Sequence, residues 1–231
     1  MEQDTELKNV YERDMAEFPP GTTYDIAFKT VEDKDTVLEI GCATGYWAKY
    51  TKKHKPEVEI YGLDYLEYHV ERAKETNCYK EVMQYDLNNA DDSLDRFKQK
   101  FDKIVILDVL EHLYDPKKVL TWLRNFLKPD GKIIISVPNV GHKSIIHQLL
   151  LGQFNYTQEG LLDRTHIRFF TGNSFSRLLT ETSFKIKQVM KLQIPRSPYE
   201  QYLPAEINNY INNLPEANSF EYIFIATPDE E

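Results

Sequence analysis

Small residues recur at every second position in one short turn of the sequence. Gly41, Ala43 and Gly45 follow the apolar run Thr36–Ile40. Where a buried strand turns into a helix, unpaired backbone N–H groups are left at the helix start, and small side chains let a ligand approach them. The stretch from Glu39 to Gly45 is therefore predicted to be a ligand loop, and the plain alternative is a tight structural turn.

Aspartates close three later strand-like runs. Asp64, Asp86 and Asp108 each follow a stretch of mostly apolar residues. A carboxylate at a strand end can accept hydrogen bonds from both hydroxyls of a ribose or from an amine. We expect the three side chains to lie along the same edge of a sheet as the ligand loop. For Asp86 the plain alternative is a helix cap.

The loop does not match two common phosphate-binding patterns. A dinucleotide fingerprint needs a small residue where Tyr46 stands, and no Gly-Lys-Ser/Thr follows for a Walker loop. A nicotinamide-dependent oxidoreductase is disfavoured for this reason.

Two histidines occur in a polar and aromatic connection, residues 140–171. His142 and His166 are candidates for a general base, because imidazole titrates near neutral pH. His166 is favoured, since Asp163 could orient its ring while Arg164 and Arg168 bind an anionic or polyhydroxylated ligand. The plain alternative is an ion network in which Asp163 pairs with one of the arginines.

Strand and helix signals alternate along most of the chain, which predicts a largely parallel sheet covered on both faces. The expected architecture is a doubly wound, Rossmann-like α/β fold with seven strands, mostly parallel, with an antiparallel terminal strand. The expected strands are 36–40, 58–63, 81–85, 101–107, 132–137, 184–192 and 220–226. Residues 1–22 are expected to be an extension and residues 23–231 the domain, with a lid or substrate insertion at 140–171.

Composition narrows the classes of function. The chain has 37 acidic and 28 basic residues, a formal charge of −9, so its average field repels nucleic acid. No apolar run reaches the roughly 20 residues of a membrane span, and the charged N-terminus lacks a signal peptide's apolar core. A cytoplasmic protein is expected. Two cysteines, Cys42 and Cys78, predict neither a disulfide framework nor a metal site.

Residues 38–45 resemble the first motif of class I S-adenosylmethionine-dependent methyltransferases, with Ala43 where that family usually has a glycine. An alanine there was expected to disfavour a positive φ angle and so reshape the loop. The stretch Asp108-Val-Leu-Glu-His112 resembles the family's fourth motif, as found in ubiquinone-biosynthesis O-methyltransferases. Residues 35–190 as a whole resemble methyltransferases found in surface-polysaccharide clusters.

This resemblance implies S-adenosylmethionine as cofactor and assigns positions to it. Asp64 would bind the ribose and Asp86 the adenine amino group, while the fourth motif would surround the methionine end. The implied cofactor residues are Glu39, Gly41, Cys42, Ala43, Gly45, Asp64, Tyr65, Asp86, Leu87, Asp108, Val109 and His112. The implied substrate residues are Asn139, Asp163, Arg164 and Arg168.

By the same resemblance, the acceptor would be a sugar or glycan hydroxyl, methylated by in-line transfer with a histidine base. A quinone or small phenol is the alternative acceptor. A catalytically silent cofactor-binding module of the same fold is a third possibility, and the oligomeric state is left open.

Overall fold

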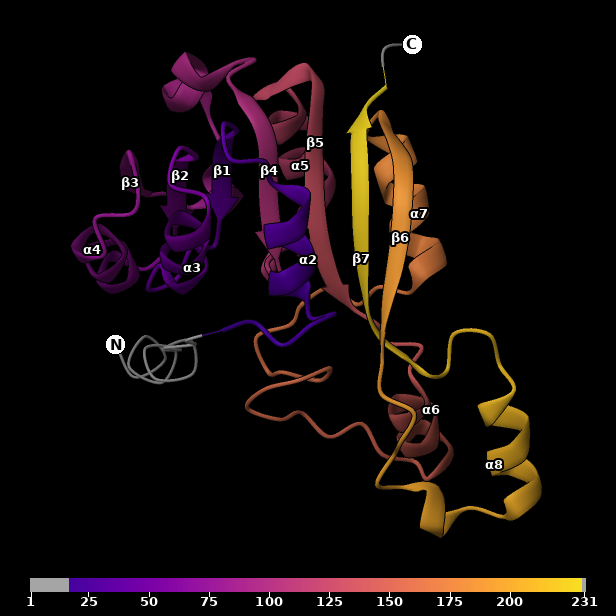
Figure 1. The fold of residues 1–231 in the computed structure, drawn as a ribbon. Coiled ribbons are helices and arrows are strands. Elements are labelled where there is room, and N and C mark those ends of the chain that lie inside the picture. Colours follow the sequence, from indigo (N-terminus) through magenta and orange to yellow (C-terminus); the bar gives the residue numbers. More distant parts are fainter. Residues whose placement is uncertain (1–16, 230–231) are drawn as a thin grey trace.

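A computed structural model describes residues 17–229 of the chain. Seven strands form one sheet in the order β3-β2-β1-β4-β5-β7-β6 (Figure 1). They are β1 (Thr36–Ile40), β2 (Glu59–Asp64), β3 (Glu81–Gln84), β4 (Phe101–Leu107), β5 (Leu127–Pro138), β6 (Phe184–Gln193) and β7 (Ser219–Pro228). Neighbours among β1 to β5 pair in parallel, whereas β7 runs antiparallel to β5 and β6. The predicted fold class is confirmed.

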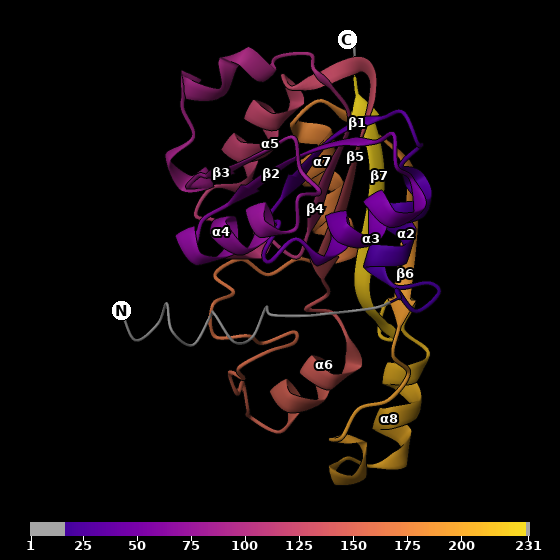
Figure 2. The ribbon, with the colours of Figure 1, turned by 60° about the vertical axis from the view of Figure 1, so that its left-hand side comes forward.

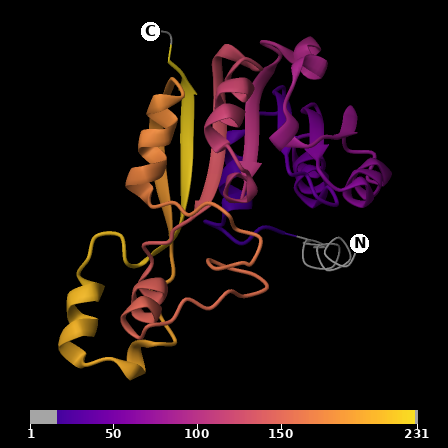
Figure 3. The same ribbon diagram turned by 180° about the vertical axis from the view of Figure 1, so that it is seen from behind.

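Helices cover both faces of the sheet (Figures 1 and 3). The α-helices of the described residues are α2 (Thr23–Thr30), α3 (Tyr46–His54), α4 (Glu67–Glu75), α5 (Pro116–Arg124), α6 (Lys143–Leu150), α7 (Gly172–Glu181) and α8 (Ala205–Asn212). Short 3₁₀ turns are η1 (Leu87–Asn89), η2 (Asp92–Phe97), η3 (Leu110–His112) and η4 (Glu200–Tyr202). Helices α2, α3 and α4 pack on one face, and α5, α7 and η2 on the other.

Strand β4 shows why this sequence forms a two-sided core. Ile104 and Ile106 join the cluster beneath α5 and α7, while Val105 between them joins the cluster beneath α2 and α3. All three side chains are almost fully buried. Burying each contributes roughly 1.5–3 kcal/mol, which explains why the run is apolar without alternation.

Two helix starts follow from local side-chain chemistry. The Asp115 carboxylate accepts a hydrogen bond from the Lys118 N–H, and Pro116 occupies the first helical position of α5. Thr171 and Ser174 form a reciprocal capping box at the start of α7. Both helices therefore begin at the edge of the sheet where the parallel strands end.

The predicted start of the fifth strand, at residue 132, was wrong. Strand β5 begins at Leu127 and runs through Pro129-Asp130-Gly131, although this combination of residues is typical of a turn. The pairing with β4 shifts from Phe101↔Leu127 to Lys103↔Lys132, so the extra residues are absorbed as a bulge. The predicted end at residue 137 falls one residue short of the observed end, Pro138.

The carboxyl ends of β4 and β5 point toward a separate cap beneath the sheet (Figures 1 and 2). The cap holds α6 and the predicted lid, and also a second segment, residues 194–218, with η4 and α8. The Lys143 N–H donates to the Ala217 carbonyl at 2.8 Å, and the Lys143 ammonium pairs with Glu200 at 2.9 Å. Two stretches distant in sequence thus form one structural unit.

Of the predicted N-terminal extension, only residues 17–22 are described. Phe18 is buried and its ring lies 4.3 Å from that of Tyr50 on α3. Across residues 17–229, no helix has the length and apolar content to cross a bilayer.

Candidate active site

The predicted ligand loop packs against the turn that follows β4. Gly41, Ala43 and Gly45 all have positive φ angles, of 70°, 45° and 80°. A methyl group added to Gly41 would lie 2.5 Å from Cγ2 of Val109, so the two turns are in direct contact. The expectation that Ala43 would disfavour a positive φ was wrong, because its N–H donates to Asp64 at 2.8 Å and holds the residue there.

Asp64 links this loop to β2. One carboxylate oxygen accepts the Ala43 N–H, and the other accepts the Leu66 N–H and lies 3.1 Å from Nδ1 of His69. A carboxylate has about four acceptor positions, so these contacts leave room for a further donor. Asp64 is 8% exposed, at the edge where a ligand could reach it.

Glu39 faces inward and not toward the edge. Its carboxyl group is buried and accepts a hydrogen bond from the Tyr79 hydroxyl at 2.7 Å. Burial raises the pKa of Glu39 to about 8, with a smaller contribution from the charge of Asp64. Cys42 is buried beside the same tyrosine, and burial raises the pKa of its thiol well above the usual value. These contacts support the loop from beneath.

Asp86 lies just after β3 and stabilises the turn that follows it. Its two carboxylate oxygens accept hydrogen bonds from the Asn88 N–H and the Asn89 side-chain amide, so it caps η1, as the plain alternative held. Leu87 is buried next to it, whereas the Tyr65 side chain at the end of β2 is 61% exposed. The Asp86 carboxylate is only partly buried and stays open to a ligand.

Asp108 follows β4 in a left-handed conformation, with φ of 54°. Its N–H donates to the Ser136 hydroxyl at 3.0 Å, and that hydroxyl donates to the Asp108 carboxylate at 2.8 Å. Glu221, from the start of β7, hydrogen-bonds the same carboxylate. Burial first, and then the charge of Asp108, raise the pKa of Glu221 well above its usual value, so Glu221 keeps its proton at neutral pH.

Glu111 and His112, three and four residues after Asp108, meet His166 of the lid segment. Glu111 is 1% exposed, and neither of its carboxylate oxygens has a hydrogen-bond partner among the described residues. Oε1 of Glu111 lies 3.8 Å from Nε2 of His166, and the His112 and His166 rings are 4.8 Å apart, edge to face. Burial holds the pKa of Glu111 well above its usual value.

The protonation of both rings follows from their neighbours. Nδ1 of His166 lies 3.2 Å from the Leu161 carbonyl, and Nδ1 of His112 lies 3.2 Å from the Thr165 carbonyl. A carbonyl only accepts, so each proton sits on Nδ1 and each Nε2 offers a lone pair. Burial lowers the pKa of both histidines below 6.5, which keeps them neutral at pH 7.

The backbone fixes this arrangement. The N–H groups of Ile167 and Arg168 both donate to the Glu111 carbonyl at 2.9 Å. The predicted lid segment is therefore attached to η3 by main-chain bonds as well as by the histidine contacts.

Glu111, His112 and His166 also have metal-ligand chemistry. Their oxygen and nitrogen atoms lie within 4.8 Å of one another, a spacing that a divalent cation could bridge. The expectation of no metal did not take this cluster into account, because His166 is distant in the sequence from the adjacent Glu111 and His112.

The other predicted substrate and base residues are held in structural contacts. His142 caps α6, and its ring bonds Ser144 and the Ile194 carbonyl at 2.8 and 2.7 Å. Asn139 is fully buried, and its amide donates to the Glu216 and Ser219 carbonyls. Both residues thus join the two cap segments.

Asp163 does not orient His166. One of its oxygens accepts the Thr165 N–H and hydroxyl, at 2.8 and 2.6 Å, so the carboxylate turns back on its own loop. The carboxyl group beside His166 is that of Glu111. Arg164 is exposed, and the exposed Arg168 donates to the Tyr114 carbonyl.

Sequence reasoning gave no role to Glu111 or Glu221. For Glu111 a signal was available, because it follows Asp108 by three residues in a turn after a buried strand. For Glu221 the signal was an acidic residue near the start of an otherwise apolar strand. The partners of both come from distant segments, which no local spacing reveals.

A protein family described as a methyltransferase domain matches residues 11–189. A ubiquinone biosynthesis O-methyltransferase from Neisseria meningitidis is 25% identical over 120 residues, which cover 51% of this chain and 50% of that protein. The ubiquinone biosynthesis O-methyltransferase from Hydrogenovibrio crunogenus is 23% identical over 164 residues, which cover 70% of this chain and 66% of that protein. For several curated relatives that it matches, the chain spans about half their length.

Solved structures share the fold. The YcgJ protein from Bacillus subtilis matches with a TM-score of 0.59 and 19% identity, over 90% of this chain and 98% of that one. An S-adenosylmethionine-dependent methyltransferase from Mesorhizobium loti matches with a TM-score of 0.60 and 14% identity, over 89% and 98%.

Proposed function

This chain belongs to the methyltransferase domain family, class I, and from that premise we propose that it transfers a methyl group from S-adenosylmethionine to a hydroxyl of a sugar or glycan. The observation that carries the proposal is His166. Its Nε2 lone pair lies beside a buried carboxyl group at the end of β4.

The residues present fit the family's cofactor, S-adenosylmethionine. A loop of small residues ends β1, and acids end β2, β3 and β4, in the order that suits the parts of an adenosyl amino acid. Asp64 would hold the ribose hydroxyls, Asp86 the adenine amino group, and the Asp108 turn the methionine end. When bound, the cofactor supplies an electrophilic methyl group on a positively charged sulfur.

The chain's own residues would then do three things. The cap positions the acceptor and excludes water, which favours an in-line displacement. Nε2 of His166 takes the hydroxyl proton, and its lowered pKa keeps it ready to do so at neutral pH. The Leu161 carbonyl accepts the Nδ1 proton and so fixes the tautomer of the ring, and the buried Glu111 carboxyl group lies 3.8 Å from Nε2.

A quinone or small phenol is the second candidate acceptor. The curated relatives carry the name ubiquinone biosynthesis O-methyltransferase. The lid also offers aromatic surface, because Phe154 lies edge-on to both Tyr156 and Phe169, and all three rings are partly exposed. Flat aromatic rings could pack there.

A labelled-methyl assay against nucleotide sugars and phenols tests the proposal. The His166→Ala variant is expected to lose about 10²- to 10⁴-fold in kcat/KM, the usual contribution of a general base. Its affinity for S-adenosylmethionine should be unchanged. The exposed His54 on α3 gives the matched control, His54→Ala, which should retain full activity.

Two further measurements sharpen the result. The apparent pKa of the acid limb in the wild-type pH–rate profile should be below 6.5, because burial lowers the pKa of His166. Turnover by His166→Ala at the wild-type rate would remove this residue from the base role. Loss of wild-type turnover on chelation, restored by a divalent cation, would instead make His166 a metal ligand.

A further inference from the structure

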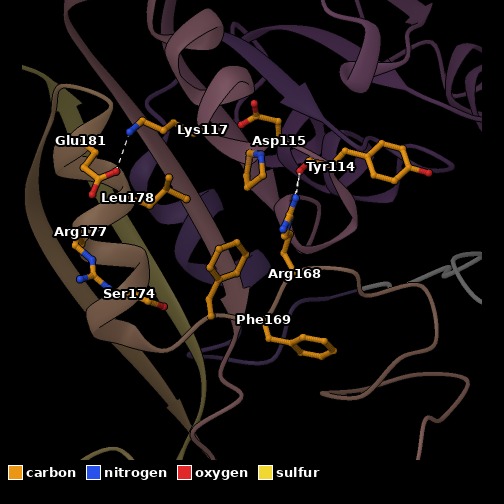
Figure 4. A pocket seen from close by; sticks show the side chains of 11 residues that line it. Tyr114, Asp115, Lys117, Arg168, Phe169, Ser174, Arg177, Leu178 and Glu181 are labelled. Atoms are coloured by element: carbon orange, nitrogen blue, oxygen red, sulfur yellow. Dashed lines mark hydrogen bonds and ion pairs between the residues drawn. The ribbon is translucent and has the colours of Figure 1, made fainter.

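A cavity lies between α5 and α7, next to the lid segment that carries His166. Its volume is about 440 Å³, and its wall combines the start of α5, the outer side of α7 and the end of the lid segment (Figure 4). Arg168 lines it from the lid segment, with its side chain directed toward Tyr114, and Arg177 and Ser174 line it from α7 on the opposite side. Of the residues that line this cavity, only Arg168 has a role predicted from the sequence, as a substrate residue.

The charges in this cavity are positive on balance. Lys117, Arg168 and Arg177 face two acids, Asp115 and Glu181. Both acids already have partners, because Asp115 caps α5 and Glu181 pairs with Lys117 at 2.8 Å. In a chain with a formal charge of −9, this is a local exception to the average field.

Within the described part of the chain neither guanidinium group forms a close ion pair with an acid, although Lys117 and, to a smaller extent, the charge of Arg177 lower the pKa of Glu181. Arg168 donates through Nε and Nη2 to the neutral Tyr114 carbonyl, as Figure 4 shows, and so keeps its full charge. Arg177 is exposed, and its nearest acid along the helix, Glu181, is engaged by Lys117. Planar guanidinium groups match the oxygens of phosphate and bind them in pairs.

The cavity is connected to the candidate base through the backbone. Arg168 stands two residues after His166, and its N–H donates to the Glu111 carbonyl. Because the N–H groups of Ile167 and Arg168 both donate to the Glu111 carbonyl, this stretch is held against η3, next to the candidate base. A molecule with a hydroxyl at His166 could therefore place an anionic group over Arg168.

We propose that this cavity is a phosphate-binding subsite in which Arg168 and Arg177 hold the phosphate group of the acceptor. The link to an acceptor rests on the proposed function, whereas phosphate binding itself does not. Free phosphate or pyrophosphate is the other source of the same chemistry, and the test separates the two.

The first arm measures binding without turnover. Pyrophosphate is titrated into the purified full chain and followed calorimetrically at low and high salt. Wild type should bind, and Arg177→Ala should weaken binding about tenfold, the loss expected for a charge-assisted hydrogen bond. The matched control Lys187→Ala removes an exposed positive charge on β6 and should change nothing. No binding, or equal binding by Arg177→Ala, would overturn the subsite.

The second arm identifies the source. KM is compared for a glycoside and its phosphorylated counterpart. Arg177→Ala should raise KM about tenfold for the phosphorylated acceptor only. Equal KM values for the two acceptors in wild type would overturn the acceptor assignment. If pyrophosphate binding depends on Arg177 while no acceptor is methylated, the subsite stands and the proposed function fails.

Discussion

Three buried carboxyl groups govern the pH behaviour of this protein at the residue scale. The pKa values of Glu39, Glu111 and Glu221 are all raised, in each case mainly by burial. Each group therefore keeps its proton at a pH where an exposed carboxyl group is ionised. Glu39 supports the cofactor loop, while the other two lie beside Asp108 and His166.

The raised pKa of Glu39 leads to a prediction about how stability depends on pH. Its pKa is about 8 in the folded chain and near 4.5 when unfolded, so the folded state binds the extra proton between these values. The free energy of unfolding should fall as pH rises from 4.5 through 8, by roughly 3 to 5 kcal/mol from this group. Glu39→Gln should remove that part of the pH dependence and be more stable than wild type at pH 8.

Urea unfolding of both proteins at pH 5 and pH 8 measures this. The difference between the two pH values, compared between wild type and variant, isolates Glu39 from Glu111 and Glu221. The same change in the free energy of unfolding between pH 5 and pH 8 in both proteins would mean that Glu39 is ionised in the folded state.

At this scale the sequence predicts some positions and misses others. The ends of three strands are marked locally by Asp64, Asp86 and Asp108, because each follows an apolar run. The neighbour of His166 is not marked, because Glu111 precedes it by 55 residues and the chain between them includes α5, β5 and α6. Asp163 was the nearer carboxylate in sequence, yet it bonds Thr165.

At the scale of elements, the contact between the loop after β1 and the turn after β4 positions the site. Gly41→Ala should disrupt it, since the new methyl group would meet Cγ2 of Val109 at 2.5 Å. We expect a loss of about 1–3 kcal/mol in stability and weaker binding of S-adenosylhomocysteine. Thermal unfolding and calorimetry measure the two effects.

Gly152 provides the matched control. Its φ of 69° is close to the 70° of Gly41, but an added methyl group would meet nothing within 4 Å. Gly152→Ala thus carries the backbone strain without the clash. The second substitution Val109→Ala should partly rescue Gly41→Ala. Equal losses in the two glycine variants, without rescue, would show that the clash does not matter.

The cap shows where element-level prediction ends. The lid at 140–171 is anticipated because the alternation of strands and helices breaks there. The second segment, 194–218, is an ordinary link in sequence, and only the contacts of Lys143 and His142 with it reveal that both belong together. The association of these two segments depends on tertiary contacts, which no local sequence pattern predicts.

For the whole molecule, the alternation of elements was enough to predict the sheet. Five parallel strands with crossovers, followed by an antiparallel terminal pair, permit few arrangements, and the strand order confirms the expected class. The bulge at residues 129–131 was missed because proline and glycine usually mark turns. The fold alone does not choose an acceptor, since one fold supports many substrates.

Titration of S-adenosylhomocysteine into the purified chain by calorimetry tests the central claim most directly. One molecule should bind per chain, and Asp64→Ala should weaken binding about tenfold, because a ribose ligand at the end of β2 is lost. Absence of binding at saturating concentration, or binding that Asp64→Ala leaves unchanged, would contradict a cofactor site at this edge of the sheet.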